Sequence, residues 1–379
     1  MIFLRNKWIM FLILFPHFSI YYLQTLEFEL INIIWSSLVI IVAILITLTK
    51  LQVHKFSIVV SILLLLVIIS SYLNGTLSVS ITFHATILIS VCIYLLYCLE
   101  EIKEALKGLY YLCGFIVISN LLTVMFPNIN PVTGQEIYLL GGKNQVIITV
   151  TLSVCVSYLY FLFNGKKNII PKIIIALGLL STYLAGSGTG TVIVFLLILY
   201  ILLHKKIKPT FIVLFLIYIS TFLTIVIFRL QEILFKNFIV NVLHKSLTFS
   251  DRTFIWDVTI DAVKNSWLIG YGRDNNIILT KVSSLGVDQA HNGLLEISLE
   301  SGVLGVLVFI YILLLIGRRL DEYRLSFEAS LISVTIFLYL IIGLTESIFY
   351  RIEFWIVLIL GYSILRIIDK TRSRFNVKL

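Results

Sequence analysis

The most informative shortage in this sequence is of charge. Only 13% of its 379 residues are charged, while 59% are hydrophobic and the mean hydropathy is +1.05. A soluble domain carries nearer a quarter charged residues because its surface must be wetted, so a water-soluble fold of this length is excluded. The apolar runs are long and do not alternate, which favours membrane-spanning helices of roughly 20 residues over a β-barrel.

The sequence also has few cysteines and lacks the motifs of several kinds of site. Its four cysteines lie inside apolar runs without metal-ligand or redox spacing, so they read as small buried hydrophobes. The turn at 186–190 has neither the Gly-Lys-Ser/Thr ending of a phosphate-binding loop nor a dinucleotide fingerprint. The net charge of +9 comes from scattered lysines and arginines rather than a basic stripe, so no nucleic-acid partner is expected.

The apolar runs predict an all-α, polytopic membrane protein that crosses the bilayer about twelve times. The first run has the basic-then-apolar look of a signal peptide, but it lacks a clear cleavage site and is kept as a span. We find no internal repeat and no separate soluble domain, so residues 1–379 form one expected membrane domain. The expected spans are 8–23, 30–48, 56–73, 81–99, 109–126, 146–163, 169–185, 189–203, 211–228, 294–316, 329–348 and 354–368.

The distribution of lysine and arginine predicts the orientation of these spans. With the N-terminus inside, 20 of the 29 basic residues fall on the cytoplasmic side, and the short outer loops carry almost none. This excess follows the positive-inside rule. We therefore expect a multi-pass protein of the cytoplasmic membrane with both termini in the cytoplasm, surrounded by membrane lipid.

One expected outer segment, 229–290, between the ninth and tenth spans, is unusually long. Connections longer than about 15 residues are uncommon and are usually functional or disordered, and the aromatic residues of this one favour a fold. Within it, 251–267 reads as an amphipathic helix with Trp256 and Trp267 on one face. Such a helix either lies flat in the outer headgroup layer or packs on the membrane domain, and periodicity leaves both readings open.

Ionisable side chains gather at the expected outer ends of the helices rather than inside the spans, where insertion costs roughly 2.5–3.5 kcal/mol. His291 precedes a good N-cap at the positive end of the tenth span, which attracts anions and favours a neutral imidazole. Glu296 and Glu300 follow on one face of that span. Two like charges there need a cationic partner, for which Arg252 and Arg273 are candidates. The alternative readings are a capping or interfacial His291 and purely structural glutamates.

Several of these residues stand in an ordered set of short motifs. The set resembles the O-antigen ligase and polysaccharide polymerase family, bacterial membrane glycosyltransferases of the GT-C type. One turn departs from the family pattern, because Gly188 stands where many relatives carry an arginine. Either other cations bind the diphosphate of the family's lipid-linked substrate, or the alignment with the family is displaced at this turn. The matching motifs are Gly141-Gly-Lys143-Asn144, Arg252-x-x-x-Trp256, Gly270-x-Gly272, His291-Asn292-x-x-x-Glu296 and Gly302-x-x-Gly305.

The resemblance implies a donor oligosaccharide linked through diphosphate to a polyprenyl lipid such as undecaprenol. Such a donor is already activated, because the lipid diphosphate leaves readily once its charge is neutralised. On this resemblance we expect Arg252 and Arg273 to bind the diphosphate, since the planar arginine fork suits phosphate oxygens. Lys143 or Arg229 would support them. No metal and no other cofactor is expected.

For the acceptor side, the resemblance implies that His291 deprotonates or orients the attacking hydroxyl, while Glu296 or Glu300 holds an arginine or the acceptor. We expect a cell-surface polysaccharide polymerase that joins lipid-linked repeat units at the outer face of the membrane. An O-antigen ligase, a lipid-linked oligosaccharide flippase or transporter, and a scaffold for other polysaccharide-export proteins are the alternatives. Transport predicts midplane charges and duplicated halves, and the sequence has neither. Richness in Ile, Lys, Asn and Phe indicates an AT-rich genome and favours a Gram-positive polymerase.

Overall fold

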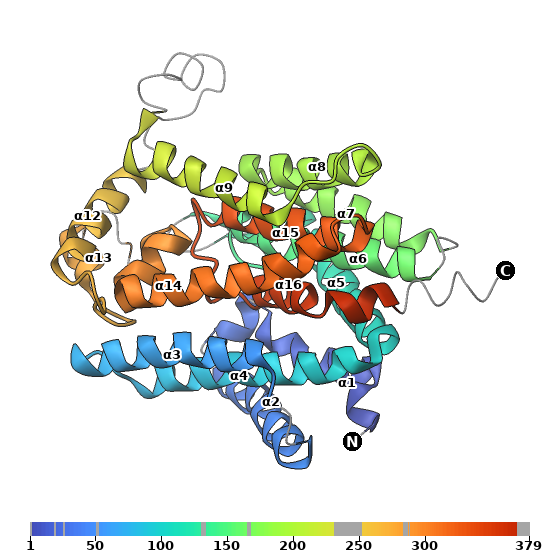
Figure 1. Cartoon of the computed structure of the whole chain (residues 1–379), viewed down its shortest axis with the longest axis horizontal. Coiled ribbons are helices and arrows are strands. Elements are labelled where there is room, and N and C mark those ends of the chain that lie inside the picture. The colour runs from blue at the N-terminus through green and yellow to red at the C-terminus, as the bar shows by residue number, and fades with distance from the viewer. Residues whose placement is uncertain are drawn as a thin grey trace.

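The chain folds into a bundle of long helices that lie side by side. The computed structural model describes residues 2–18, 20–25, 27–50, 53–129, 134–164, 168–230, 252–282, 287 and 289–369. Figure 1 shows most long helices running along the longest axis, with the N-terminal residues at one end and α12 and α13 at the other. We call these the N-terminal end and the α12–α13 end.

The first part of the chain supplies helices to both sides of the bundle, together with one small two-stranded hairpin. Its strands pair antiparallel, Asn128 with Ile137 and Ile129 with Glu136. The elements are η1 (Ile2–Arg5), α1 (Lys7–Leu14), η2 (Phe15–His17), η3 (Tyr21–Gln24), α2 (Glu29–Lys50), α3 (Lys55–Leu73), α4 (Val79–Cys98), η4 (Leu99–Glu101), α5 (Ile102–Met125), β1 (Asn128–Ile129) and β2 (Glu136–Ile137).

The second part of the chain completes the bundle and forms the α12–α13 end. Side-chain caps mark several of its helix starts: Ser187, Thr210 and Ser326 each accept a hydrogen bond from a backbone N–H of the first turn. The elements are α6 (Lys143–Phe163), α7 (Ile170–Leu184), α8 (Gly188–Leu203), α9 (Phe211–Phe222), η5 (Leu223–Ile227), α12 (Arg252–Asn265), α13 (Ile277–Lys281), α14 (Gly293–Glu322), α15 (Phe327–Ile342) and α16 (Ile352–Tyr362).

The apolar helices confirm a helical membrane protein. Within the described residues, 5 helical stretches are long and apolar enough to cross a bilayer: Glu29–Lys50, Lys55–Leu73, Val79–Met125, Lys143–Phe163 and Gly293–Glu322. Shorter apolar helices cover the remaining expected spans. The count of twelve crossings stays a prediction.

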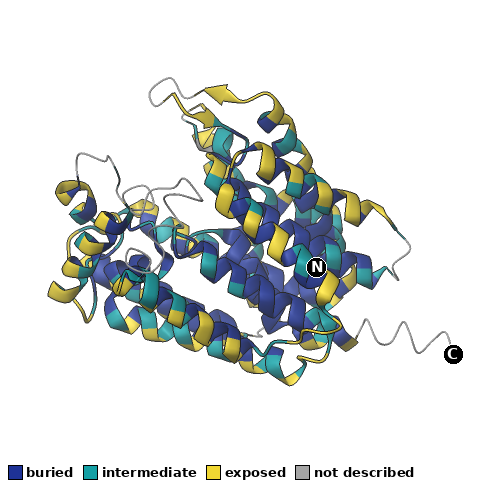
Figure 2. Ribbon diagram, turned by 90° about the horizontal axis from the view of Figure 1, so that it is seen from above, coloured by how far each residue is buried: buried dark blue, intermediate teal, exposed yellow. Residues whose placement is uncertain are grey.

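Helix α6 lies at the centre of the bundle. Buried residues make up 89% of its apolar window, against 28% for α2, and it packs against α5, α7, α8, α15 and α16. Figure 2 shows the buried residues running through the middle of the bundle, with exposed positions on its outer helices. A helix that is apolar on all sides is stable only when other helices or lipid cover it. Other helices cover α6, whereas much of α2 is left for lipid to cover.

The first expected span, 8–23, is not one continuous helix. Helix α1 ends at Leu14, and Phe15–His17 and Tyr21–Gln24 form separate 3-10 turns. The break coincides with Pro16, which lacks a backbone N–H and cannot continue a helical hydrogen-bond ladder. The polypeptide therefore runs irregularly at a depth where its neighbours remain helical.

The expected helix near 251–267 is present as α12, Arg252–Asn265. Trp256 is buried (0% exposed) and α12 packs on α14, as in the second of the two readings of this helix. Trp267 lies in the turn after the helix and is 61% exposed. Residues 231–251, 283–286 and 288 of the long segment lie outside the described part of the chain.

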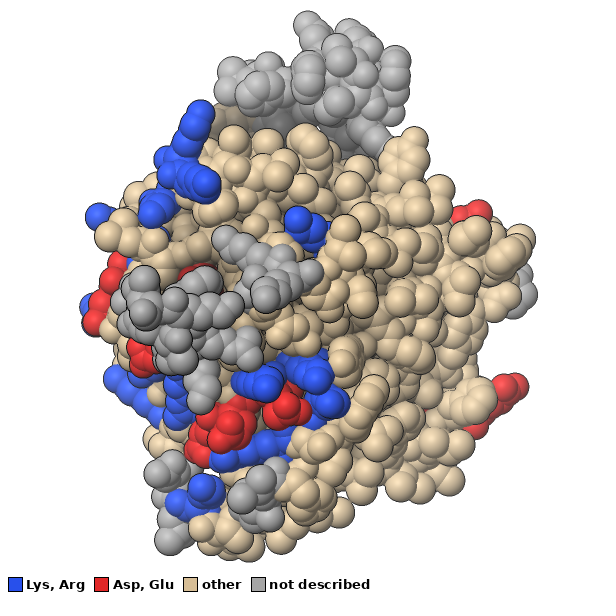
Figure 3. Space-filling model, turned by 90° about the vertical axis from the view of Figure 1, so that its right-hand side faces the viewer, with Lys and Arg blue, Asp and Glu red and all other residues tan. Residues whose placement is uncertain are grey.

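Lysines and arginines gather on the N-terminal end of the bundle, which faces the viewer in Figure 3. Arg5 and Lys50 both pair there with Glu100, and Arg5 also lies over the ring of Tyr97. This is the end that the sequence assigns to the cytoplasm, and the orientation itself stays a prediction.

Candidate active site

The backbone segment 267–272, here called the clasp, is bonded to a break in α14. The break lies at Gly302, whose φ of 62° and ψ of −161° are not helical. An added Cβ there would lie 2.3 Å from the carbonyl carbon of Leu268, so glycine is required. Backbone groups that the break frees bond to the clasp: Tyr271 N–H to Leu299 O (2.7 Å), Gly272 N–H to Glu300 O (3.0 Å) and Val303 N–H to Trp267 O (2.8 Å).

Helix α3 holds the other side of the same segment. The backbone N–H of Arg273 donates to the hydroxyl of Ser71 at 2.9 Å. Gly272, with φ 79°, approaches so closely that an added Cβ would lie 2.4 Å from the Cα of Ser71. The backbone from which the Arg273 side chain extends is therefore fixed between α3 and α14.

The start of α14 is bonded to the loop between α15 and α16, residues 343–351. The side chain of Asn292 caps α14 by accepting from the N–H groups of Leu294 and Leu295, as the sequence predicts. Its amide donates to Leu344 O at 3.0 Å, and Gly293 N–H donates to Gly343 O at 2.7 Å. The 343–351 loop is thereby placed over the first turns of α14.

Side chains of this loop reach both glutamates of α14. Glu296 (7% exposed) accepts hydrogen bonds from Ala290 N–H at 2.8 Å and from the Ser347 hydroxyl at 3.1 Å. Glu300 (3% exposed) accepts a hydrogen bond from the Tyr350 hydroxyl. Both buried carboxylates thus have donors, as buried charges require.

Arg273 meets this arrangement from the clasp side. Its guanidinium lies 3.6 Å from the centroid of the Tyr350 ring, and its Nε is 3.8 Å from a carboxylate oxygen of Asp274. Burial, and the neighbouring Glu300 carboxylate, raise the pKa of Tyr350 well above its ordinary value. Tyr350 therefore stays a neutral hydrogen-bond donor through the physiological pH range.

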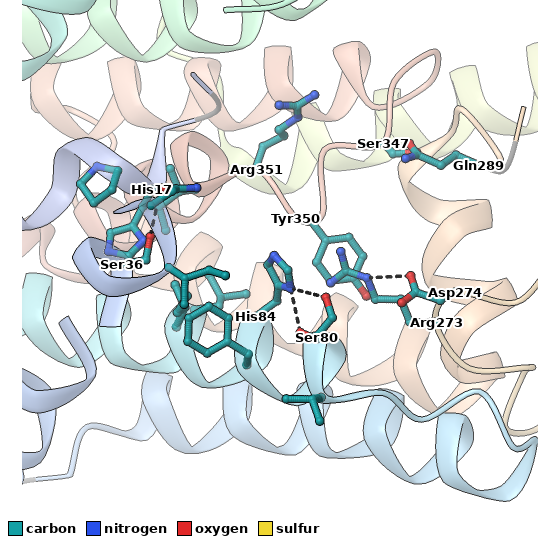
Figure 4. Close-up of a pocket in the computed structure, with 18 of the residues that line it drawn as sticks. His17, Ser36, Ser80, His84, Arg273, Asp274, Gln289, Ser347, Tyr350 and Arg351 are labelled. Atoms are coloured by element: carbon teal, nitrogen blue, oxygen red, sulfur yellow. Dashed lines mark hydrogen bonds and ion pairs between the residues drawn. The ribbon is translucent and has the colours of Figure 1, made fainter. Parts of the chain in front are cut away.

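These residues line a cavity of about 1020 Å³ at the α12–α13 end. Figure 4 shows His17 and Ser36 at one side of it and Arg273 and Asp274 at the other, with His84, Tyr350 and Arg351 between them. Glu296 and Glu300 also line it. Exposed polar residues such as Asp274 and exposed apolar residues such as Ile33 both belong to the lining, as expected for a cavity that opens to both water and lipid.

Of the seven residues singled out from the sequence, some line this cavity and others do not. Arg273, Glu296 and Glu300 line the cavity, as expected for a shared site. The other four do not belong to its described lining. Arg252 pairs with Glu346 at 2.6 Å, Arg229 pairs with Asp257, Lys143 is exposed at the first position of α6, and His291 is half-buried just before the α14 cap.

Sequence reasoning missed several residues of the cavity. Arg351 follows Tyr350 in the chain and lines the cavity. Its guanidinium donates to the side-chain oxygen of Gln145 at 3.1 Å, and the amide nitrogen of Gln145 donates to Leu140 O. Arg351 belongs to the outer charge cluster of the sequence, but nothing in its neighbours marks it as a site residue. His17 also lines the cavity, and the one feature of the sequence that could have indicated it is Pro16, which interrupts an apolar run. Among the described residues, no cluster of three or more metal-ligating side chains is present.

The fold and the cavity define a multi-pass helical membrane protein with a charged site at one end of its bundle. The family model for O-antigen ligase matches residues 173–310, which include the clasp, Arg273 and the first half of α14. This match confirms the family resemblance seen in the motifs. A search of curated proteins finds no match to the chain.

Proposed function

We propose that this protein is a bacterial cell-surface polysaccharide polymerase, which joins polyprenyl-diphosphate-linked oligosaccharide repeat units. The observation that carries the proposal is the shared cavity, which is lined by Arg273, Glu296 and Glu300 from the region matched by the O-antigen ligase model and by Arg351 from outside it. Such a family acts on lipid-linked oligosaccharides, and its match gives no support to a flippase. A cavity that borders both water and lipid suits a substrate with a lipid tail and a sugar chain.

The donor diphosphate binds Arg273 and Arg351 in this proposal. Arginine presents planar, bidentate donors that fit phosphate oxygens. Arg273 is fixed by its backbone and stacked on Tyr350, so its guanidinium is ordered before the donor arrives. Arg252 and Arg229 are already engaged with carboxylates and act in support, by holding α12 in place.

The reaction transfers the donor glycan to a hydroxyl of the acceptor. The hydroxyl oxygen forms a bond to the anomeric carbon, the bond from that carbon to the diphosphate oxygen breaks, and its electron pair leaves with the lipid diphosphate. The hydroxyl proton passes to a base. His291 and Glu296 are the two candidates: His291 has the suitable chemistry, and Glu296 lines the cavity.

A ligase is the second candidate, because the matching family model describes an O-antigen ligase. A ligase differs only in its acceptor, which would be another glycolipid instead of a second repeat unit. The positive-inside excess of lysine and arginine supports a location in the cytoplasmic membrane with both termini inside and the cavity opening outward.

Reconstitution tests the proposal. Lipid-diphosphate repeat units isolated from cells that make the protein would be added to proteoliposomes containing the purified chain. A ladder of products supports the polymerase, transfer only to a foreign glycolipid supports the ligase, and no transfer to any acceptor overturns both.

Variants then separate the candidate bases. His291→Ala lowers turnover by about 10²–10⁴-fold if His291 is the base, while Glu296→Gln does so if Glu296 is. Lys264→Ala is a control, because Lys264 is exposed on α12 and lies outside the cavity lining. Near-normal turnover in His291→Ala would exclude His291.

A further inference from the structure

The cavity has a second half that the family motifs do not touch. The broken first span contributes His17 and Phe18 to it. Irregular backbone at membrane depth is tolerated only where protein covers it or where it lines a water-filled cavity. The break after Leu14 is therefore explained if its purpose is to place side chains in the cavity.

Helices α2 and α4 line this half with one face each. Glu29, Asn32 and Ser36 of α2 are separated by three and four residues, the spacing of one helical face. Ser80 and His84 of α4 are likewise one turn apart. Both helices thus turn a polar stripe toward the cavity near their first turns, although the rest of each helix is mostly apolar.

The polar groups of this half suit hydroxyl groups better than phosphate. Its described lining, residues 16–88, contains neither lysine nor arginine. Nδ1 of His84 lies 2.7 Å from the Ser80 carbonyl and donates to it, so Nε2 of the neutral ring is an acceptor. Nε2 of His17 is buried and has no hydrogen-bond partner among the described residues.

Aromatic rings complete this half of the cavity. Phe18 and Phe83 line it beside the polar groups. Pockets that bind neutral organic ligands combine apolar and aromatic walls with a few placed polar groups. A sugar ring has this double character, with C–H faces that pack on aromatic rings and hydroxyls that both donate and accept.

We propose that the half of the cavity lined by residues 16–88 is the binding subsite for the acceptor saccharide. This inference rests on the proposed function, and it assigns the two substrates to adjoining parts of the cavity. Arg273 and Arg351 hold the anionic diphosphate of the donor, and the part formed by the broken span, α2 and α4, which has no lysine or arginine, holds the sugar whose hydroxyl attacks. The hydroxyl oxygen then bonds to the anomeric carbon while the lipid diphosphate departs with the electron pair of the broken bond, and the proton goes to the base.

The test measures the two substrates separately in proteoliposomes. The donor is the isolated lipid-diphosphate repeat unit, and the acceptor is the same oligosaccharide freed from its lipid by mild acid. Asn32→Ala should raise KM for the acceptor about tenfold, the usual effect of losing one hydrogen bond. It should leave KM for the donor, and the slow transfer of the donor to water, unchanged.

Two further variants keep the test decisive. His17→Gln, which replaces the imidazole ring by an amide, should also raise KM for the acceptor, and Arg273→Ala should raise KM for the donor. Ser37→Ala is the matched control, because Ser37 is on α2 next to Ser36 but does not line the cavity. Folding of each variant is checked by its elution profile in detergent.

The outcomes are distinguishable. An acceptor KM in Asn32→Ala and His17→Gln equal to that of the unmodified protein overturns the subsite. A parallel loss of donor hydrolysis in these variants overturns it too, because this part of the cavity would then serve the donor. If the unmodified protein shows no transfer at all, the proposed function itself fails.

Discussion

The substitution Gly302→Ala should separate the clasp from α14 and disable the site without removing any charged group. Gly302 has a backbone conformation that is almost confined to glycine, with φ 62° and ψ −161°. An alanine Cβ would stand 2.3 Å from both the carbonyl carbon and the oxygen of Leu268. Atoms of this kind settle about 3.5–4 Å apart, so the clasp must withdraw by about 1 Å.

The structure allows the size of the effect to be worked out. The backbone strain alone costs about 1–3 kcal/mol. Withdrawal of the clasp weakens four backbone hydrogen bonds to α14, including Leu304 N–H to Leu268 O, each with a net contribution of about 1 kcal/mol. The clasp leads directly into Arg273, and a misplacement of about 1 Å at a reacting centre can lower a rate about 10²-fold.

The assay is transfer of lipid-linked repeat units in proteoliposomes, together with thermal unfolding in detergent. We expect transfer to fall about 100-fold while the protein still inserts into the membrane. Gly188→Ala is the matched control, because an added Cβ there meets no atom within 4 Å, and it should keep full activity. Full activity in Gly302→Ala would refute the role of the clasp in placing Arg273.

Three other outcomes are expected. Tyr350→Phe should remove an alkaline loss of stability. Burial raises the pKa of Tyr350 in the folded protein above the unfolded value of about 10. The neutral Tyr350 hydroxyl therefore contributes fully to stability below pH of about 10, and this contribution is lost as pH rises from there toward the folded pKa. Unfolding midpoints of the two proteins from pH 7 to 11 would therefore converge; parallel curves would contradict this. In a double-mutant cycle, Arg252→Ala and Glu346→Ala should show a coupling of about 0.5–3 kcal/mol, and additive effects would mean that the pair of 2.6 Å contributes nothing. Transfer should be unchanged by EDTA, and its loss in chelator would show that a divalent cation assists the diphosphate.

The sequence predicted the membrane class, and it singled out three residues of the cavity, Arg273, Glu296 and Glu300, because these features depend on local chemistry. Long apolar runs locate the helices, and the N-cap at Asn292 locates the start of α14. The pair Glu296 and Glu300 lies on one helix face by spacing alone. These features require no knowledge of which helices become neighbours.

The partners of those residues could not be predicted, since partner choice depends on tertiary packing. Arg252 pairs with Glu346 of the 343–351 loop, a partner that the sequence did not indicate, and its role at the diphosphate stays a prediction. The same loop contributes Tyr350, which donates to Glu300 from 50 residues further along the chain, and Arg351, which lines the same cavity. The break at Gly302 was equally hidden, because a glycine inside an apolar run usually indicates close helix packing.

Tyr350 lies between the guanidinium of Arg273 and the buried carboxyl group of Glu300 in the same cavity. Its hydroxyl donates to Glu300, and its ring face carries Arg273. A direct salt bridge would occupy the N–H donors of Arg273, and an arriving phosphate would then have to displace the carboxylate. Among the described residues, the ion pair of Arg273 is instead with Asp274, at a long 3.8 Å and with that carboxylate 56% exposed. The tyrosine thus separates the two groups and donates to the buried carboxyl of Glu300, and under the proposed function this leaves the guanidinium donors of Arg273 for the diphosphate of the substrate.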